Sequence, residues 1–209
     1  INWCTFDKTV MKWNNQKRNE YKEKFRTALS ETTGEYISYN SAPAITFWHK
    51  ISHGKTENSL DILGHEYPYH KSVPSEFDKK APGYITRVIY TKDAFCTIMS
   101  GLGIRMLNTN NISNDILGEI TRTPGGCVTE IQILNHTYSG QEIMNAFKLK
   151  SSFFTITVDD LNVVFEVKGC GHNVGLSQYG ANIMAIKGSS YKDILNYYYP
   201  NAIISSLIT

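Results

Sequence analysis

The stretch SFFTITVDDLNVVFEVKGCGHNVGLSQYGANIMAIKG, residues 152–188, carries the clearest fold signal in this chain of 209 residues. Its first half alternates polar and apolar residues around a DDLN turn, which predicts a β-hairpin. Glycines then mark a turn, and the segment near residues 177–187 has the apolar period of a helix. Hairpins followed by separate helices are typical of α+β proteins with mostly antiparallel sheets.

Other segments repeat this mixture of hairpins and helices. We expect an amphipathic helix over residues 14–33, a hairpin over 35–49 and a short helix that is capped by Thr91 and runs through Met99. We further expect a hairpin around the PGG turn at 124–126, a helix over 140–148 capped by Ser139, and a short helix capped by Ser190. Residues 52–82 show no sustained period, and a stretch that long is more often functional than idle. The sequence therefore predicts an α+β fold around a substrate groove, as one region over residues 1–209 with sub-lobes 1–90 and 91–209 as an option.

The composition is that of an ordinary folded chain. Hydrophobic residues make up 41% and charged residues 19%, and 21 Lys and Arg against 19 Asp and Glu leave a net charge of +2. So small a charge does not favour a nucleic-acid partner. No uncharged apolar stretch reaches the roughly 18 residues of a membrane helix. Because the chain opens at Ile1 with Trp3 and Cys4, which normally have partners inside a fold, we expect it to be a piece of a longer protein.

Four cysteines stand at positions 4, 96, 127 and 170. They form no CxxC pair, and the chain has no HExxH motif, so the patterns of a zinc ribbon and of a metalloprotease are both excluded. Disulfides and buried free thiols are both compatible with this spacing. The size of the chain favours free thiols, because a core this large needs no covalent staples.

The glycine-rich stretch GCGHNVGLSQYGA, residues 169–181, is the first candidate site. Ser177 is placed to cap the following helix and to leave its N-terminal amides facing the loop. His172, Ser177 and Gln178 would then converge at one loop-to-helix junction. The alternative is a glycine-rich corner whose histidine only satisfies buried backbone groups.

The second candidate site is FWHKISHGKTENS, residues 47–59. A strand would deliver His49 to its end, and the loop that follows carries Ser52, His53 and Glu57. Hydroxyls, amides and aromatic faces suit sugars, and one carboxyl group of raised pKa would act as general acid. Glu57 is the leading candidate for that acid, against the alternative of a solvated loop glutamate. His49 and His53 have a metal-binding spacing only on a helix, so we expect no zinc there.

Together these stretches resemble the stage II sporulation protein D family. GHNVGLSQYGANIMAIKGSSYKDILNYYYPN looks like the family's closing motif GHGVGMSQYGA followed by MA, Gly, an IL pair and HYYP, and FWHKISHGKTEN looks like its FHSTSGGKTEN. Four further segments are similar to segments of the family. TALSETTGEYISYNSAPA is similar to AV..T.G..I.Y.G.P, and PYHKSV is similar to PYL.SV. ITRTPGGCVTEIQI is similar to RT.SGRV, and LKSSFFTI is similar to LRS..F.I. The likeness runs in order from about residue 4 to residue 204.

The resemblance implies a lytic transglycosylase that cleaves the glycan strands of peptidoglycan during forespore engulfment in endospore-forming bacteria. One protonated carboxyl group donates to the glycosidic oxygen, and the sugar's own 6-hydroxyl closes on the anomeric carbon. The residues that would line the groove are His49, Ser52, Glu57, His172, Ser177, Gln178 and Tyr179. The alternative is a noncatalytic peptidoglycan-binding module that enhances an amidase.

The family's acid is a glutamate in an EMP motif, followed by an EALKAQAVAARTYA-like helix, and neither string occurs in these 209 residues. Both would lie before Ile1, so the catalytic residue is left unassigned and we expect the fragment alone to be inactive. Glu57 matches a different family position, which we interpret as loop structure or substrate contact.

The family's zinc pattern, CxxxxHCxxW, is also broken. Cys4 and Trp13 keep their places, but Thr9 and Val10 stand where His and Cys are usual, so we predict no zinc and no other cofactor. Further departures indicate a divergent member or paralogue; they are Asn173 for Gly, Lys50, Ile51 and His53 for Ser, Thr and Gly, and Met144 for Arg.

The resemblance finally implies a place for the whole protein. It would be extracytoplasmic, beside the forming forespore, and anchored by a membrane helix upstream of this chain. Its partners would be glycan strands, an amidase and other engulfment proteins.

Overall fold

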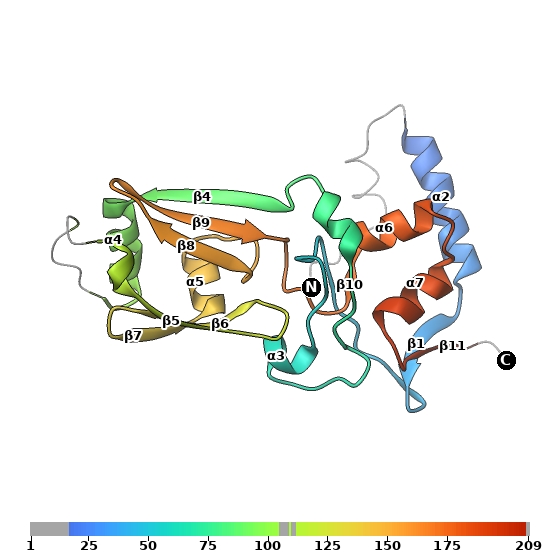
Figure 1. Ribbon diagram of the computed structural model, residues 1–209. Coiled ribbons are helices and arrows are strands. Elements are labelled where there is room, and N and C mark those ends of the chain that lie inside the picture. The colour runs from blue at the N-terminus through green and yellow to red at the C-terminus, as the bar shows by residue number, and fades with distance from the viewer. Residues whose placement is uncertain (1–16, 105–108, 110–111, 208–209) are drawn as a thin grey trace. The chain divides into compact units, whose positions relative to one another are not determined.

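The computed structural model describes residues 17–104, 109 and 112–207, which divide into two compact units. The first unit takes residues 1–43 and 204–209, and the second takes residues 44–203 (Figure 1). The predicted zinc-pattern positions Cys4, Thr9, Val10 and Trp13 lie outside the described residues.

The first unit is built from helix α2 (Arg18–Glu31) and a small sheet. β1 (Glu35–Tyr39) turns back into β2 (Ala42–Pro43), and β11 (Ile203–Ser206) lies on the other side of β1. The helix expected over residues 14–33 is thus confirmed within the described residues. The expected hairpin over 35–49 stops at Pro43, because Trp48 and His49 pair with a different strand.

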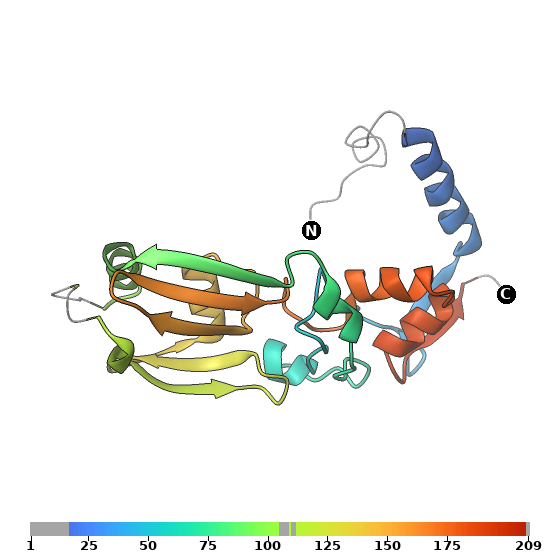
Figure 2. The ribbon, with the colours of Figure 1, turned by 45° about the horizontal axis from the view of Figure 1, so that its top comes forward.

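Two antiparallel sheets make up much of the second unit. β4 (Ile85–Thr91), β9 (Asn162–Lys168) and β8 (Phe154–Val158) form one sheet in the order β4-β9-β8, and β5 (Leu117–Arg122), β6 (Val128–Ile133) and β7 (His136–Ser139) form the other in sequence order. Figure 2 shows the two sheets next to each other. Both predicted hairpins, around residues 124–126 and 159–161, are confirmed.

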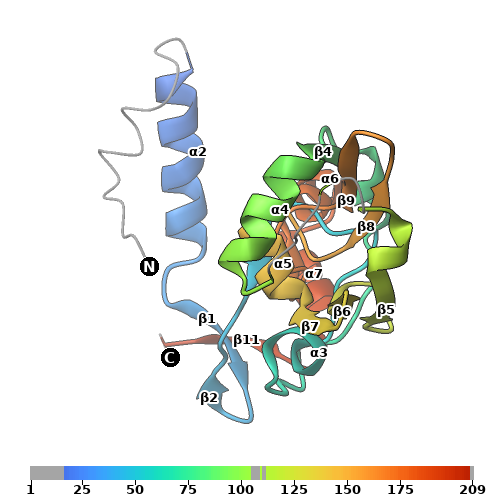
Figure 3. The ribbon, with the colours of Figure 1, turned by 90° about the vertical axis from the view of Figure 1, so that its left-hand side faces the viewer.

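Alternation along the strands decides which side chains enter the interior. In β9 the buried residues are Val163, Phe165 and Val167, and every second residue between them is half-buried. Helix α4 (Lys92–Gly101) adds Phe95 and Met99, and α5 (Gly140–Ala146) adds Ile143. α4 covers one end of the sheets (Figure 3). We call this continuous apolar cluster the sheet core.

Four helices of the second unit begin directly after the predicted capping residues. The side chains of Thr91 and Ser139 accept backbone hydrogen bonds at the starts of α4 and α5. Ser177 does the same for α6 (Gln178–Ile186), and Ser190 for α7 (Tyr191–Tyr198). The four predicted caps are therefore confirmed.

Residues 50–84 contain little regular structure, as the sequence predicts. A short helix α3 (Ser59–Leu63) and a 3-10 turn η1 (Glu76–Lys80) interrupt the segment. Across the described residues, none of the helices combines the length and the apolar character needed to cross a bilayer. The α+β class with mostly antiparallel strands is thus confirmed.

Candidate functional site

The two predicted site stretches fold against each other. β3 (Trp48–His49) pairs in parallel with β10 (Leu176–Ser177), with Leu176 opposite Trp48 and Ser177 opposite His49. Backbone bonds extend the contact, from Cys170 N to Ile51 O at 2.7 Å and from Glu57 N to Asn173 O at 2.7 Å. We call residues 47–59 and 169–180 the two-strand junction.

A buried carboxylate, that of Asp78 in η1, ties the two-strand junction together. Its Oδ2 accepts hydrogen bonds from the backbone N and the Oγ of Ser52, at 2.9 and 2.5 Å. Its Oδ1 accepts from Ser177 Oγ at 2.8 Å, and the same hydroxyl accepts from Gly180 N to cap α6. These charge-assisted bonds offset the cost of burying the carboxylate. Asp78 is missed by sequence reasoning, because a lone Asp in an aperiodic polar segment carries no local signal.

Two histidines of the two-strand junction are held in the neutral form. His49 is buried, its Nδ1 donates to Val174 O at 3.2 Å, and burial lowers its pKa to about 3. His172 is half-buried, its Nδ1 accepts from Val174 N at 3.0 Å, and burial lowers its pKa as well. The ring proton of His172 is therefore on Nε2, where it is a hydrogen-bond donor.

The seven predicted site residues divide by exposure. Gln178 is exposed, and His172 and Tyr179 are half-buried, with the Tyr179 hydroxyl 3.4 Å from Lys80 O. The four that are buried are His49, Ser52, Glu57 and Ser177. The buried four form contacts within the protein, whereas the other three reach the solvent.

A row of aromatic rings continues from His172. Phe47 lies 6.0 Å from His172 between ring centroids, Tyr67 lies 5.8 Å from Phe47, and His65 lies 4.7 Å from Tyr67. Phe47 and Tyr67 are half-buried and His65 is exposed. We call these four residues the aromatic row. Tyr67 and His65 are missed by the sequence analysis, although a Tyr- and His-rich segment without regular structure is a usable signal.

A small pocket opens beside the aromatic row. Its volume is about 110 Å³, and its lining residues are Asn58, Ser59, Leu60, Asp61, Glu66, Tyr67, His70 and Lys71. Amide, hydroxyl, carboxylate and aromatic groups therefore meet at one concave place, which is the mixture of groups that orients a polar ligand.

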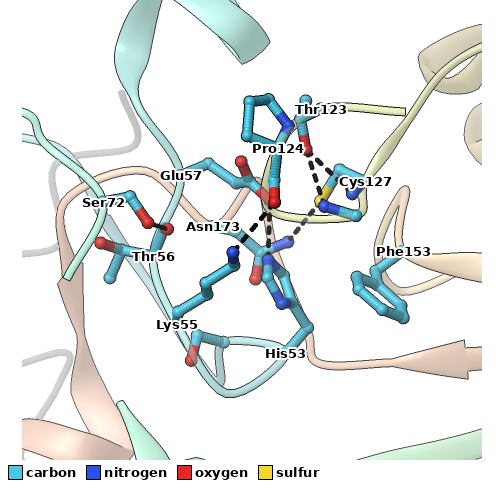
Figure 4. Close-up of polar contacts among 12 residues, drawn as sticks. His53, Lys55, Thr56, Glu57, Ser72, Thr123, Pro124, Cys127, Phe153 and Asn173 are labelled. Carbon is cyan, nitrogen blue, oxygen red and sulfur yellow. Dashed lines mark hydrogen bonds and ion pairs between the residues drawn. The ribbon is translucent and has the colours of Figure 1, made fainter. Parts of the chain in front are cut away.

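Glu57 is a buried residue of the two-strand junction. Only 1% of Glu57 is exposed, and its Oε1 lies 2.8 Å from His53 Nε2 (Figure 4). Cys127, from the turn after β5, lies close by, and burial together with the Glu57 carboxylate raises the pKa of the thiol to about 12. A Cβ at Gly125 would overlap the Glu57 carboxylate, so only glycine fits there.

A larger pocket of about 290 Å³ lies next to this buried group, on the side of His53 and Gly125. Its lining residues are His53, Gly54, Lys55, Pro74, Glu76, Lys79, Gly125 and Phe153. None of the three cysteines that the structure describes, Cys96, Cys127 and Cys170, forms a disulfide, which agrees with the favoured prediction.

Comparison with known proteins finds no matching family model, but it finds similar curated proteins. The chain is 34% identical over 184 residues to stage II sporulation protein D of Bacillus amyloliquefaciens, which is 88% of this chain and 51% of that protein. Identity to the Bacillus subtilis protein of the same name is 34% over 183 residues, again 88% and 51%. The chain thus spans about half the length of these relatives. A shorter match, 39% over 64 residues, covers 31% of this chain and 9% of the amidase enhancer of Bacillus subtilis.

Proposed function

Because this chain belongs to the stage II sporulation protein D family, we propose that it is the glycan-holding part of a peptidoglycan lytic transglycosylase that acts on the cell wall in sporulation. The observation that carries the proposal is the folding of both family-like motifs into the two-strand junction, which positions His172, Gln178 and Tyr179 at the surface.

The chemistry of these surface groups suits a glycan. Sugar hydroxyls need hydrogen-bond partners, which the His172 Nε2–H, the Gln178 amide and the Tyr179 hydroxyl supply. The apolar C–H faces of sugar rings pack on aromatic rings, and the aromatic row extends that surface from His172 toward His65. A net charge of +2 imposes no strong field on the strand.

The buried carboxylates act in structure rather than as the proton donor. Asp78 accepts three hydrogen bonds inside the two-strand junction, and Glu57 is paired with His53. A general acid has to reach the glycosidic oxygen, at hydrogen-bond distance or through one water. We therefore assign cleavage to the whole protein and strand binding to the 209 residues.

The activity test uses the complete protein with denuded glycan strands. Mass spectrometry of the products is expected to show 1,6-anhydromuramyl ends, because the sugar's 6-hydroxyl replaces water as nucleophile. Hydrolysed reducing ends, or uncut strands, would contradict the proposed activity.

A second candidate function is noncatalytic enhancement of an amidase. The match of 64 residues to an amidase enhancer favours it. In that case the chain would accelerate the release of stem peptides by an added amidase and would produce no anhydro ends. Anhydro ends without any effect on the amidase would exclude this candidate.

The proposed substrate also implies a cellular location and partners for the whole protein. Peptidoglycan lies outside the cytoplasmic membrane, so we propose an extracytoplasmic location next to other engulfment proteins, including an amidase. Protease added to protoplasts of sporulating cells, whose cytoplasmic membrane is intact, is expected to degrade the whole protein. Complete protection of the protein from the protease would contradict the proposed location.

A further inference from the structure

Three buried side chains, two of them from the two-strand junction, meet with the chemistry of a metal site. His53 and Glu57 come from the loop after β3, and Cys127 comes from the turn between β5 and β6. One ligand atom from each lies within 4.8 Å of the other two. Their exposed fractions are 6%, 1% and 0%. An imidazole nitrogen, a carboxylate oxygen and a thiolate sulfur are the ligand types that zinc takes in proteins.

We propose that His53, Glu57 and Cys127 bind one Zn²⁺ ion. Ligand atoms around tetrahedral zinc stand about 3.5 Å apart, so the separations of up to 4.8 Å close by about 1 Å through side-chain rotation. The 2.8 Å contact between His53 and Glu57 opens slightly as the ion enters between them. As the ion binds, the Cys127 thiol proton is released to solvent, and the His53 ring changes from the tautomer that donates from Nε2 to Glu57 to the tautomer with its proton on Nδ1, so that the Nε2 lone pair can bind the metal.

The surroundings of the three residues restrict their movement. The Phe153 ring stacks on the His53 ring with centroids 4.6 Å apart and planes 26° apart. Thr123 Oγ1 accepts from Cys127 N at 3.0 Å and holds the turn that presents the sulfur (Figure 4). Supporting contacts of this kind orient metal ligands and preserve the geometry of the site.

Asn173 places a buried amide against the cluster. Its Nδ2 donates to Cys127 Sγ at 3.5 Å and to Ser151 Oγ at 3.3 Å. Among the described residues its Oδ1 has no hydrogen-bond partner, so the amide has an acceptor left for a further polar group.

The cluster borders a pocket. The pocket of about 290 Å³ is lined by both His53 and Gly125, and Gly125 lies directly against the Glu57 carboxylate. His53 is therefore the ligand through which the proposed site is next to solvent, and a water molecule would supply the fourth ligand of an open zinc site.

The proposed site is separate from the zinc pattern at Cys4–Trp13 that the sequence analysis finds broken. The family-like strings quoted above have Gly at position 53 and Arg at position 127, where this chain has His53 and Cys127. An Arg at position 127 would neutralise the Glu57 carboxylate directly. His53 and Cys127 instead form, together with Glu57, a set of ligands for a metal cation. We therefore expect zinc binding to distinguish this chain from relatives that keep the Gly and the Arg.

The test measures zinc in the 209-residue chain. The purified chain is stripped with chelator, dialysed against zinc sulfate and analysed for bound metal, and about one zinc per chain is expected. His53→Gly and Cys127→Ser are each expected to weaken zinc binding at least about tenfold in competition with a chromogenic chelator. Cys96→Ser removes a buried thiol of the sheet core, and Cys4→Ser removes the cysteine of the broken pattern, so both controls should bind zinc as the parent does.

Three results would overturn the proposal: no zinc in the parent chain, unchanged zinc in Cys127→Ser, or loss of zinc in Cys4→Ser. If Cys127→Ser fails to fold, cobalt(II) added to the Cys4→Ser chain replaces it as the test. A sulfur-to-cobalt charge-transfer band is expected there, and its absence would contradict thiolate ligation. Glycan binding is measured separately, so failure of the zinc site leaves the proposed function intact.

Discussion

The sheet core and the two-strand junction lie in the same unit but are held together by different forces. The sheet core contains apolar side chains that alternate along strands, such as Val163, Phe165 and Val167. The two-strand junction contains short paired segments and buried polar groups that depend on individual hydrogen bonds, with the Asp78 carboxylate at the centre. Stability in the first region is spread over many contacts, whereas in the second it depends on a few hydrogen bonds whose loss leaves partners unsatisfied.

The largest effect is expected in the sheet core. Phe165→Ala should lower the free energy of unfolding by about 4 kcal/mol, because Phe165 is fully buried against Phe147 and Phe154 and its removal leaves a cavity. Urea unfolding followed by circular dichroism measures it. Phe165→Leu, which keeps most of the volume, should cost about 1 kcal/mol. Equal losses in the two variants would show that cavity formation is not the cause.

Exchange of a single atom in the two-strand junction should lower the free energy of unfolding nearly as much. Asp78→Asn replaces one carboxylate oxygen by an NH₂ donor that faces a hydroxyl or an N–H donor, so a loss of about 3 kcal/mol is expected. The same urea titration measures it. The exposed turn residue Asp160 provides the matched control, and Asp160→Asn should change stability by less than about 0.5 kcal/mol. An Asp78→Asn variant as stable as the parent would contradict the view that the stability of the two-strand junction depends on a few hydrogen bonds.

Acid should weaken the two-strand junction through His49. The pKa of His49 is lowered from 6.5 to about 3 in the folded state, so below pH 6.5 the unfolded chain binds a proton that the folded chain refuses. Stability therefore falls as the pH falls from about 6.5 toward 3, and His49 should account for about 2 kcal/mol between pH 7 and pH 5. Urea midpoints for the parent and for His49→Asn at both pH values check this. An equal pH response of the two would contradict it.

Helix capping should be equivalent beside the sheet core and away from it, and this comparison has the smallest expected effect. Ser139 and Ser190 each form a complete capping box, at the start of α5 against the sheet core and at the start of α7 outside it. Ser139→Ala and Ser190→Ala should each cost about 1 kcal/mol in thermal or urea unfolding. A difference of more than about 1 kcal/mol would mean that capping is coupled to the interior of one region.

Local sequence signals predict the sheet core well and the two-strand junction less completely. Alternation and the turns near residues 124–126 and 159–161 locate the hairpins, and Thr91, Ser139, Ser177 and Ser190 locate helix starts, because each signal lies within a few residues of its effect. β3 and β10 have only two residues each, and their partners are far apart in the chain, so no period exists to reveal them.

The candidate site follows the same rule. The two motif stretches indicate His172, Gln178 and Tyr179, and the structure brings both stretches together. Asp78 comes from a segment with no motif of its own, and Cys127 comes from a family-like turn whose sequence does not show that it meets Glu57; both reach the buried groups only through tertiary folding. The sequence also does not reveal that His49, Ser52, Glu57 and Ser177 are buried. A polar residue in a solvent-exposed loop and one that forms hydrogen bonds inside the protein have the same local sequence pattern.

The most direct test of the central claim is binding to purified peptidoglycan by sedimentation, with the 209-residue chain and two surface variants of the two-strand junction. His172→Ala and Gln178→Ala are each expected to weaken binding about tenfold, which corresponds to about 1.4 kcal/mol. Neither should move the urea midpoint much, because Gln178 is exposed and His172 is only half-buried. Gln141→Ala, an exposed glutamine on α5, should bind as the parent does. Unchanged binding by both His172→Ala and Gln178→Ala would contradict the assignment of the two-strand junction as the glycan-binding surface.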